Sequence, residues 1–316
     1  MQAIQYSKYG GPEGLELVER PNPEPGPGQV LVEIHSASVN PIDWKLRAGQ
    51  LKLIHPLSLP AIPGYDLAGT VVAMGPGVSK FKIGDEVYSR SNHKDGGACA
   101  QLIAIDESVV AHKPKTMSFD EAAAVPLAAL TALQALRDKA SVKDGDRVLI
   151  HGASGGVGGY AVQIARALVR DAHVVGTCSE KNRELVQSFG AHEVLDYRTT
   201  DPLQTGETYD VIFDAVAKLG FGNSKKALKP GGHYVTTLPA PDVILAKIVG
   251  NLFSSRKADI IIMQPDGPDL EYLTGLAEAG QLRSVIDSTF PLSETRAAHE
   301  QSATGHTNGK IVIHVK

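Results

Sequence analysis

The chain has 316 residues and a formal net charge of -4, and its 42% hydrophobic and 21% charged residues are typical of a globular protein. This charge provides no overall attraction for nucleic acid or an anionic membrane surface. The length exceeds the usual size of one domain, so two domains are expected. Cys99 and Cys178 are the only cysteines, which excludes a disulfide framework and predicts two buried free thiols.

The amino-terminal residues, MQAIQYSKYGGPEGLELVERP, lack the layout of a secretory signal, and no stretch reaches eighteen uncharged apolar residues. The most apolar late segment, Val243 to Met263, contains several charged residues and is expected to form a buried helix followed by a strand. We therefore expect a cytoplasmic protein without a membrane partner.

The first 120 residues are predicted to form a β-rich domain, because short alternating segments are separated by turns rich in proline and glycine. The clearest strand candidates are Val30 to Ile34, Ala68 to Ala73 and Glu86 to Tyr88. Ser118 and Glu121 then show the S-x-x-E spacing of a capping box. A helix should begin there and continue to Ala140, with a bend near Pro126.

From Arg147 onward, apolar strands alternate with amphipathic helices. The strand candidates are RVLIH, HVVGT, EVLDY, DVIFDAV and, after the KPGG turn, HYVTTL. This alternation predicts βαβ units and a doubly wound parallel sheet with helices on both faces. After about Asp266, a helix, the strand-like SVIDSTF, another helix and the strand KIVIHV follow.

The strongest chemical signal is HGASGGVGGYAVQIAR, residues 151 to 166, which joins an apolar strand to an amphipathic helix. Gly155 and Gly158 fill the second and third glycine positions of G-x-G-x-x-G, while Ala153 replaces the first. Glycine is needed because a Cβ would block the approach of a pyrophosphate, and the following helix offers free N–H groups to that anion. We expect Gly155, Gly156, Val157 and Gly158 to bind a dinucleotide.

The choice between the two nicotinamide cofactors is read at the end of the next strand, where an acidic residue would bind the ribose of NAD. Cys178 stands at this position. The nearby side chains that could hold a 2′-phosphate are Ser179, Lys181, Arg183 and Tyr197, with Arg198 beside them. This set favours NADPH. The alternative is that Lys181 and Arg183 are ordinary surface residues and that Glu180 binds the ribose of NADH.

Together with these features, the sequence resembles the medium-chain dehydrogenase/reductase superfamily, in its quinone oxidoreductase and enone reductase branch. The markers are NPIDWKLRAG, PGYDLAGTVVAMGPGV, FKIGDEVY, VPLAALTALQAL, HGASGGVG, GAHEVLDY and GKIVI, in this order along the whole chain. The resemblance implies an α/β protein in which a Rossmann domain, residues 123–266, lies between the two segments of a GroES-like β-barrel domain, residues 1–122 and 267–316.

Zinc ligands of the related alcohol dehydrogenases are missing from this sequence. Such a site needs two cysteines and a histidine, often with a glutamate beside the histidine in a G-H-E segment. That segment is Gly64-Tyr65-Asp66 here, and the region of the first cysteine is Asn40-Pro41-Ile42-Asp43. We therefore expect no metal.

The resemblance also implies roles for individual residues. Asn40, Asp43 and Lys45 should line the nicotinamide side of the site, with Thr131 near the ring, although Lys45 could instead be an exposed loop lysine. Further cofactor contacts are implied for Ala215, Val216, Thr237, Leu238, Gly309 and Lys310. A purely structural turn is the alternative for the last two residues.

Without a metal to polarise a carbonyl, reduction of an already activated acceptor is favoured. We expect hydride transfer from NADPH to a quinone or to the β-carbon of an α,β-unsaturated carbonyl, with a proton from Tyr65 or water. Tyr65 could equally pack under the nicotinamide. The alternative outside the enzymes is a non-catalytic protein that binds NADPH. Nucleic-acid binding is not expected, because the sequence has no basic stripe.

Two-fold pairing of Rossmann domains is common in the family that the chain resembles. The candidate interface for a homodimer is the apolar segment from Ile244 to Ile262, in which Leu252 and Ile261 are the positions to test. With this interface the chain would have two kinds of binding partner, which are its small-molecule substrate and a second copy of itself.

Overall fold

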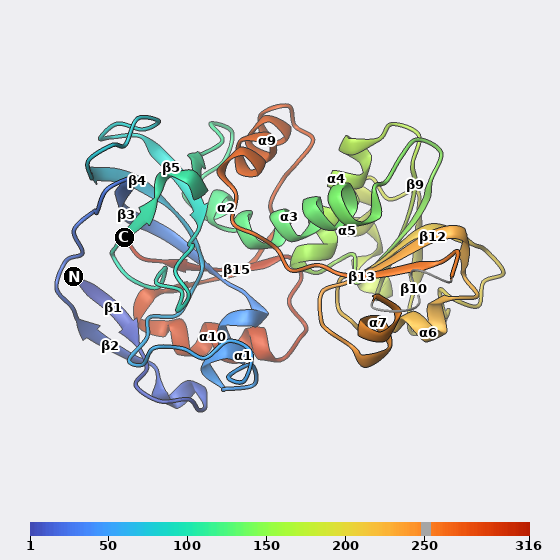
Figure 1. Ribbon diagram of the computed structural model, residues 1–316, viewed down its shortest axis with the longest axis horizontal. Helices are drawn as coiled ribbons and strands as arrows, with labels where there is room; N and C mark the ends of the chain where they lie inside the picture. Colours follow the sequence, from blue (N-terminus) through green and yellow to red (C-terminus); the bar gives the residue numbers. More distant parts are fainter. Residues whose placement is uncertain (248–253) are drawn as a thin grey trace. The chain divides into compact units, whose positions relative to one another are not determined.

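The computed structural model describes residues 1–247 and 254–316 (Figure 1). The chain divides into two compact units. The first unit combines Met1–Leu130 with Pro265–Lys316, and the second unit is the continuous segment Thr131–Gln264. No helix among the described residues is long and apolar enough to cross a membrane.

The first unit is built around the long strand β3 (Gln29–Val39), which pairs with β4, β6 and β15. Its main sheet has the strand order β14-β15-β3-β4-β5-β7. The remaining strands are β1 (Gln2–Gln5), β2 (Glu16–Glu19), β4 (Asp66–Met74), β5 (Glu86–Arg90), β6 (Leu102–Asp106), β7 (Val110–His112), β14 (Ile286–Pro291) and β15 (Lys310–His314). The three predicted strands thus lie within β3, β4 and β5. Alternate side chains of β3, such as Val30 and Val32, are fully buried in the core of this unit.

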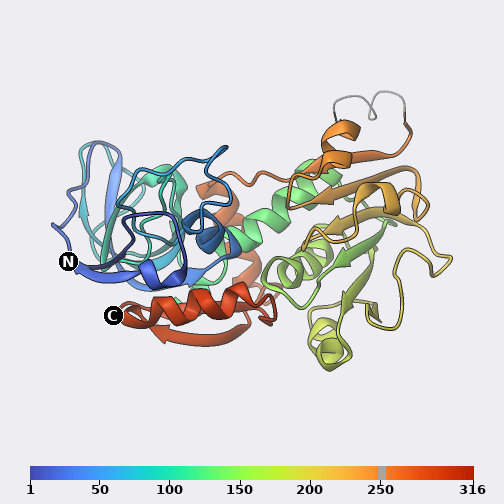
Figure 2. The same ribbon diagram turned by 90° about the horizontal axis from the view of Figure 1, so that it is seen from below.

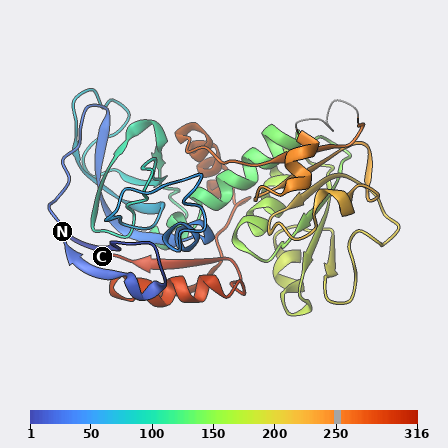
Figure 3. The same cartoon turned by 60° about the horizontal axis from the view of Figure 1, so that its bottom comes forward.

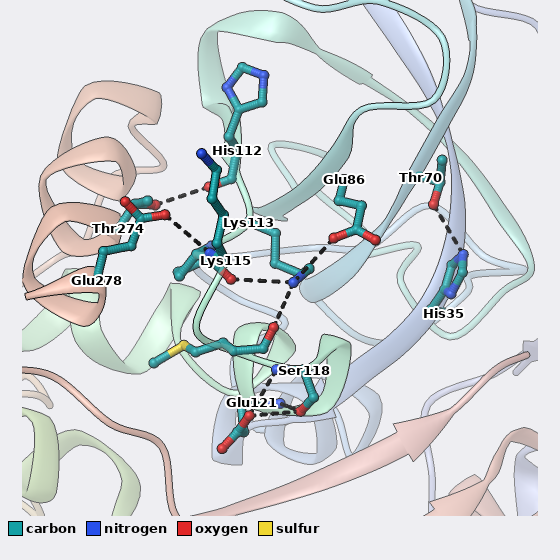
Figure 4. Close-up of polar contacts among 12 residues, drawn as sticks. His35, Thr70, Glu86, His112, Lys113, Lys115, Ser118, Glu121, Thr274 and Glu278 are labelled. Carbon is teal, nitrogen blue, oxygen red and sulfur yellow. Dashed lines mark hydrogen bonds and ion pairs between the residues drawn. The ribbon is translucent and has the colours of Figure 1, made fainter. Parts of the chain in front are cut away.

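Carboxy-terminal residues complete the first unit with helices α9 (Gly267–Glu278) and α10 (Thr295–Ala303) and the short turn η6 (Leu292–Glu294). Its amino-terminal segment contains helix α1 (Pro41–Arg47) and the short turns η1 (Pro12–Gly14) and η2 (Glu107–Val109). Figures 2 and 3 show α10 beside the carboxy-terminal strands. Helix α9 is tied to β7 and to the segment that follows it: Thr274 Oγ1 donates to the carbonyl of His112, and the N–H of Lys115 donates to Glu278 (Figure 4).

The predicted capping box is confirmed at the start of α2 (Phe119–Ala123). The N–H of Glu121 donates to Ser118 Oγ, and the N–H of Ser118 donates to the Glu121 carboxylate at 2.8 Å (Figure 4). The expected single helix to Ala140 is instead divided. A second helix, α3 (Pro126–Leu133), starts at the proline, whose ring cannot sit inside a continuous helix, and it continues into the π-helical segment η3 (Gln134–Ala140).

The second unit contains a six-stranded parallel sheet with the order β10-β9-β8-β11-β12-β13. This is the strand order of a Rossmann fold, as predicted. The strands are β8 (Arg147–His151), β9 (His173–Cys178), β10 (Glu193–Asp196), β11 (Tyr209–Asp214), β12 (Leu228–Thr236) and β13 (Lys257–Ile260). The helices are α4 (Gly156–Leu168), η4 (Glu180–Asn182), α5 (Arg183–Ser188), α6 (Phe221–Ser224) and α7 (Pro241–Leu245). Helices α6 and α7 lie together beside β12 and β13 (Figure 1).

The KPGG segment differs from its prediction as a turn before a strand. It lies inside β12, where the register with β11 shifts between Tyr209 and Val211. Gly231 adopts a φ of +86°, and a Cβ on Gly232 would meet three backbone oxygens within 3.1 Å, so two glycines allow the strand to absorb the irregularity. The expected helix and strand between Val243 and Met263 correspond to α7 and β13, but the helix is not buried as expected, since Ile244 and Leu245 are exposed. Leu252 lies outside the described residues.

Candidate functional site

The glycine-rich turn joins the end of β8 to the start of α4. Gly152 has a φ of +82°, and a Cβ there would lie 2.7 Å from Val216. A Cβ on Gly158 would lie 2.1 Å from the carbonyl oxygen of Gly152, so this glycine lets the helix pack onto the strand end. Around Gly155, by contrast, a Cβ would meet only one atom, at 3.5 Å. The outer side of the turn is therefore open at Gly155.

The amino terminus of α4 fits an anion. Gly155 is the N-cap residue, and no side chain caps the helix. The first N–H groups of a helix have no intrahelical acceptor, and the helix dipole adds positive potential at that end. Gly156, Val157 and Gly158 form this first turn, so the structure brings together the residues predicted to bind the pyrophosphate. Gly156 and Val157 are partly exposed, whereas Gly158 is buried.

The residues predicted to read the 2′-position lie around the end of β9. Ser179 is buried, Lys181 is exposed, and Tyr197 is 49% exposed with the Arg198 guanidinium 5.9 Å from its ring centre. Arg183 is already engaged. Its guanidinium donates to both carboxylate oxygens of Glu180, at 2.8 and 2.7 Å, and to the carbonyl oxygen of Val194 at 2.6 Å.

This ion pair limits how Arg183 and Glu180 can contribute to cofactor recognition. The guanidinium neutralises the only acidic side chain that the alternative reading assigns to the ribose of NADH. Of the three cations near the end of β9, Lys181 and Arg198 therefore remain without an ion pair among the described residues. Spacing in the sequence contained this signal, since an acidic residue three positions before an arginine in a helical turn commonly pairs with it.

The other predicted cofactor residues of the second unit follow β11 and β12. Ala215 and Val216 come directly after β11, and Val216 is 42% exposed. After β12, the hydroxyl of Thr237 donates to the carbonyl of Ala215 at 3.3 Å, and Leu238 is 38% exposed. The structure therefore places these two pairs next to each other at the carboxyl edge of the sheet. Thr131 lies on α3 and is buried.

In the first unit, Asn40 belongs to a buried polar cluster. Its side-chain oxygen accepts a hydrogen bond from Lys310 Nζ at 2.5 Å, and its Nδ2 donates to Asp66 at 2.8 Å. Lys310 Nζ also lies 3.4 Å from Asp66 Oδ2, and the hydroxyl of Ser38 donates to the same oxygen at 3.0 Å. Both ends of the Asn40 amide are therefore used inside the protein.

Asp66 is the residue that sequence reasoning missed. It is completely buried, and its second carboxylate oxygen accepts the N–H of Leu127 at 2.8 Å, in the first turn of α3. The carboxylate thus joins β3, β4, α3 and β15 within one unit. Only its acidic character inside an otherwise apolar strand segment, PGYDLAG, could have indicated this role.

Lys310 and Gly309 are explained by the fold. The side chain of Lys310 points into the cluster, and the residue is 4% exposed; burial lowers its pKa and Asp66 opposes that shift. Gly309 has a φ of +81°, and a Cβ there would lie 2.2 Å from the carbonyl of Val285. Both residues thus have contacts within the first unit, and their contact with a cofactor stays a prediction.

Asp43 forms a second capping box, with α1. Its Oδ2 accepts the N–H of Asn40 at 2.7 Å, while its Oδ1 is buried without a hydrogen-bond donor among the described residues. Burial raises the pKa of this carboxyl to about 7, and the charge of Asp66 adds to the shift. Close to neutral pH, the group is therefore able to exchange a proton.

Tyr65 and Lys45 have contrasting environments. The phenol of Tyr65 donates to the carbonyl of Lys94 at 2.6 Å, and the residue is 2% exposed, with the Arg90 guanidinium 4.3 Å from the ring centre. Its proton is therefore committed to a backbone acceptor. Lys45 is half-buried, its Nζ lies 5.5 Å from the ring centre of Trp44, and within the described part of the chain it forms no ion pair. Lys45 thus retains a cation that a ligand could use.

The described residues do not fit a catalytic zinc ion. No three histidine, cysteine, aspartate or glutamate side chains among residues 1–247 and 254–316 form a group that could hold a metal. Asp66 lies in the segment that carries a zinc ligand in the related alcohol dehydrogenases. Both of its carboxylate oxygens accept hydrogen bonds in the cluster described above. Cys99 and Cys178 are buried free thiols, as predicted.

Comparison with known proteins agrees with this architecture. Residues 26–134 match the family model of the alcohol dehydrogenase GroES-like domain, and residues 189–313 match that of the zinc-binding dehydrogenases. The chloroplast envelope quinone oxidoreductase homolog of Arabidopsis thaliana is 37% identical over 99% of this chain and 98% of its own length. The NADPH-dependent alkenal/one oxidoreductase of the same plant is 33% identical, over 99% of this chain and 79% of its own.

A solved structure of similar fold is the quinone oxidoreductase from Coxiella burnetii. It superposes with a TM-score of 0.89 at 35% sequence identity, and the match covers 100% of this chain and 99% of that one. The GroES-like and Rossmann parts predicted from the sequence are therefore confirmed. Because full-length relatives share more than a third of its residues, the chain belongs to the medium-chain dehydrogenase/reductase superfamily of oxidoreductases.

Proposed function

We propose that the protein is an NADPH-dependent oxidoreductase that reduces quinones or the carbon–carbon double bond of α,β-unsaturated carbonyl compounds, without zinc. The observation that carries the proposal is the open turn at Gly155 before the uncapped helix α4, in a sheet with Rossmann strand order. Relatives named as quinone and alkenal/one oxidoreductases support the reaction class.

The bound cofactor would supply the hydride. Gly155, Gly156, Val157 and Gly158 would hold its pyrophosphate, and the exposed or open residues of the two strand ends, Val216 and Leu238, would border its ribose and nicotinamide. Lys45 would give its free cation to a phosphate or ribose. Asp43 would hold a proton near neutral pH, whereas Tyr65 would need to release the carbonyl of Lys94 before it could donate one.

The polar cluster would act on the acceptor indirectly. Because Asn40 is held at both ends by Lys310 and Asp66, its backbone and α1 are fixed in one position. A fixed α1 presents Asp43, Trp44 and Lys45 in a constant arrangement, which lowers the cost of ordering them when substrate binds. In this proposal Asn40 and Asp66 are positioning residues.

A direct test is to titrate the protein with NADPH and NADH by calorimetry and then follow absorbance at 340 nm with quinones, 2-alkenals and 2-alkenones. Binding of NADPH with turnover supports the proposal, and the preferred acceptors identify the substrate class. Binding without turnover on any acceptor would favour the non-catalytic alternative. Activity that is lost with chelators and restored by zinc would contradict the zinc-independent mechanism.

Cofactor selectivity should depend on Lys181 and Arg198 more than on Arg183. Replacing either Lys181 or Arg198 by alanine is expected to weaken NADPH binding by roughly 10- to 100-fold, because one charge-assisted contact contributes about 1.5 to 3 kcal/mol, and to leave NADH binding nearly unchanged. Calorimetry on both cofactors gives the ratio. Arg183→Ala is the matched control, since its guanidinium is already paired with Glu180; a larger loss of NADPH affinity in that variant would contradict the assignment.

We also propose a homodimer formed through the edge of the Rossmann sheet. Strand β13 ends the strand order, and Ile262 and Leu245 beside it are 73% and 65% exposed, whereas Ile261 is 6% exposed and belongs to the core. Ile262→Asp should therefore convert a dimer to a monomer, measured by light scattering after gel filtration, without a change in circular dichroism. Ile261→Asp would damage the fold instead. A dimer that persists in Ile262→Asp would exclude this surface.

A further inference from the structure

A row of polar residues crosses the carboxyl ends of neighbouring strands in the second unit. Thr177 of β9 pairs in register with His151 of β8, and His151 pairs with Asp214 of β11. Thr177 and Asp214 are completely buried, and His151 is 8% exposed. Buried polar side chains at this position need hydrogen-bond partners, so the row is expected to hold neighbouring backbone in place.

Thr177 connects the row to the glycine-rich turn. Its hydroxyl oxygen accepts the N–H of Gly152 at 3.1 Å and lies 2.7 Å from Nδ1 of His151. The Thr177 carbonyl also accepts the N–H of Ala153 at 2.8 Å. Because the hydroxyl acts as the acceptor toward Gly152, its single hydrogen remains available for donation to His151.

Neutral His151 with its proton on Nε2 would let Nδ1 accept this hydrogen. Burial lowers the pKa of His151, and Lys218 lowers it further, while Asp214 and Asp201 raise it. The net shift is downward, so the ring is neutral at physiological pH. In this form Nδ1 accepts from Thr177, and one continuous chain of hydrogen bonds runs from the imidazole through the hydroxyl to the backbone of the turn.

Asp214 supports the next loop in the same row. Its Oδ2 accepts the N–H of Leu219 at 2.7 Å and the hydroxyl of Tyr234 at 2.8 Å. The loop between Asp214 and Leu219 contains Ala217 in the left-handed region, with a φ of +55°. The carboxylate thus closes a strained loop that carries Ala215 and Val216, two of the proposed cofactor residues.

We propose that Thr177 and His151 are positioning residues for the dinucleotide, because they fix the direction of the Gly152 peptide where the phosphate-binding turn leaves β8. This inference rests on the proposed nicotinamide cofactor and adds the residues that preorganise its site. A turn whose N–H groups are already oriented loses less conformational freedom when the pyrophosphate binds.

Thr177→Val tests the inference, because valine keeps the shape of threonine and removes the hydroxyl. The dissociation constant for NADPH, measured by calorimetry, should rise roughly 10-fold, the effect of about one neutral hydrogen bond. ADP-ribose should lose affinity by the same factor because it contains the same pyrophosphate. Thr177→Ser, which restores the hydroxyl, should return both values to within about two-fold of wild type.

Val175→Ala is the matched control for stability, since Val175 is a fully buried core residue of the same strand and its side chain carries no polar group. It should lower Tm and leave the affinity for NADPH near the wild-type value. A lower Tm with unchanged affinity in Thr177→Val would assign the hydroxyl to fold stability alone and overturn the inference.

The tautomer of His151 gives an independent readout. Long-range proton–nitrogen correlation spectra should show the Nε2–H form in the wild-type protein and a change in that signal in Thr177→Val. A signal for the Nδ1–H form in wild type would overturn the inference. If the wild-type protein binds no dinucleotide, the proposed function is contradicted as well. If the wild type and Thr177→Val bind NADPH equally, only the inference is contradicted.

Discussion

Asp66→Ala should lower the free energy of unfolding by about 3–5 kcal/mol, because the change leaves the ammonium of Lys310 buried without the carboxylate that lies 3.4 Å from it. The variant also removes the acceptor for Ser38, Asn40 and the N–H of Leu127. Urea unfolding followed by tryptophan fluorescence measures the loss, since Trp44, the only tryptophan, lies in the same unit.

A double-mutant cycle separates the ion pair from the other hydrogen bonds. Lys310→Met alone leaves Asp66 with its three neutral donors and should cost less than Asp66→Ala. The double variant Asp66→Ala with Lys310→Met should lose less free energy of unfolding than the sum of the two single losses, by about 1–3 kcal/mol, because neither charge is left alone. Additive single effects would show that the two groups do not interact.

Gly155→Ala should abolish most of the affinity for NADPH while the protein remains folded. The added methyl group would occupy the open side of the turn, with one protein atom at 3.5 Å, where we propose that the pyrophosphate approaches. A loss of about 100-fold, or about 2.7 kcal/mol, is expected in a calorimetric titration with Tm nearly unchanged. Unchanged affinity would mean that no phosphate lies against Gly155.

Two other glycines provide the controls for this change. In Gly158→Ala the methyl group would lie 2.1 Å from a backbone oxygen, so both stability and affinity should fall, with a stability loss of about 1–3 kcal/mol. Gly275 lies within α9, and a methyl group added there would meet no atom within 4 Å. Gly275→Ala should therefore keep full affinity and raise stability by about 0.4–1 kcal/mol.

Much of the fold could be predicted because its signals are local. The alternation of strands and helices after Arg147, the glycine-rich turn and the capping box of Ser118 each depend on residues within a few positions of one another. The division of the long helix at Pro126 is also local, but the switch to π-helical structure after Leu133 has no signal in the sequence that we recognised.

The polar cluster could not be predicted in the same way. Asp66 takes its partners from β3, α3 and β15, so its role becomes visible only when segments far apart in the sequence are brought together, as with Lys310, 244 positions away. The pairing of Glu180 with Arg183 could, in contrast, have been predicted from the sequence, because the two residues are three positions apart. The Glu180 carboxylate, one helical turn away, competes with a cofactor phosphate for the Arg183 guanidinium.

The position of β15 in the first sheet has a consequence for the order of folding during synthesis. This strand lies between β14 and β3, and it brings the cation that balances Asp66. A ribosome releases the whole of Thr131–Gln264 before β15, so the second unit can fold while the first still lacks β14 and β15. Until Lys310 emerges, β3 lacks its partner along Ser36–Val39 and Asp66 lacks the ammonium that lies 3.4 Å from it, so the first unit is expected to complete its fold only after synthesis ends.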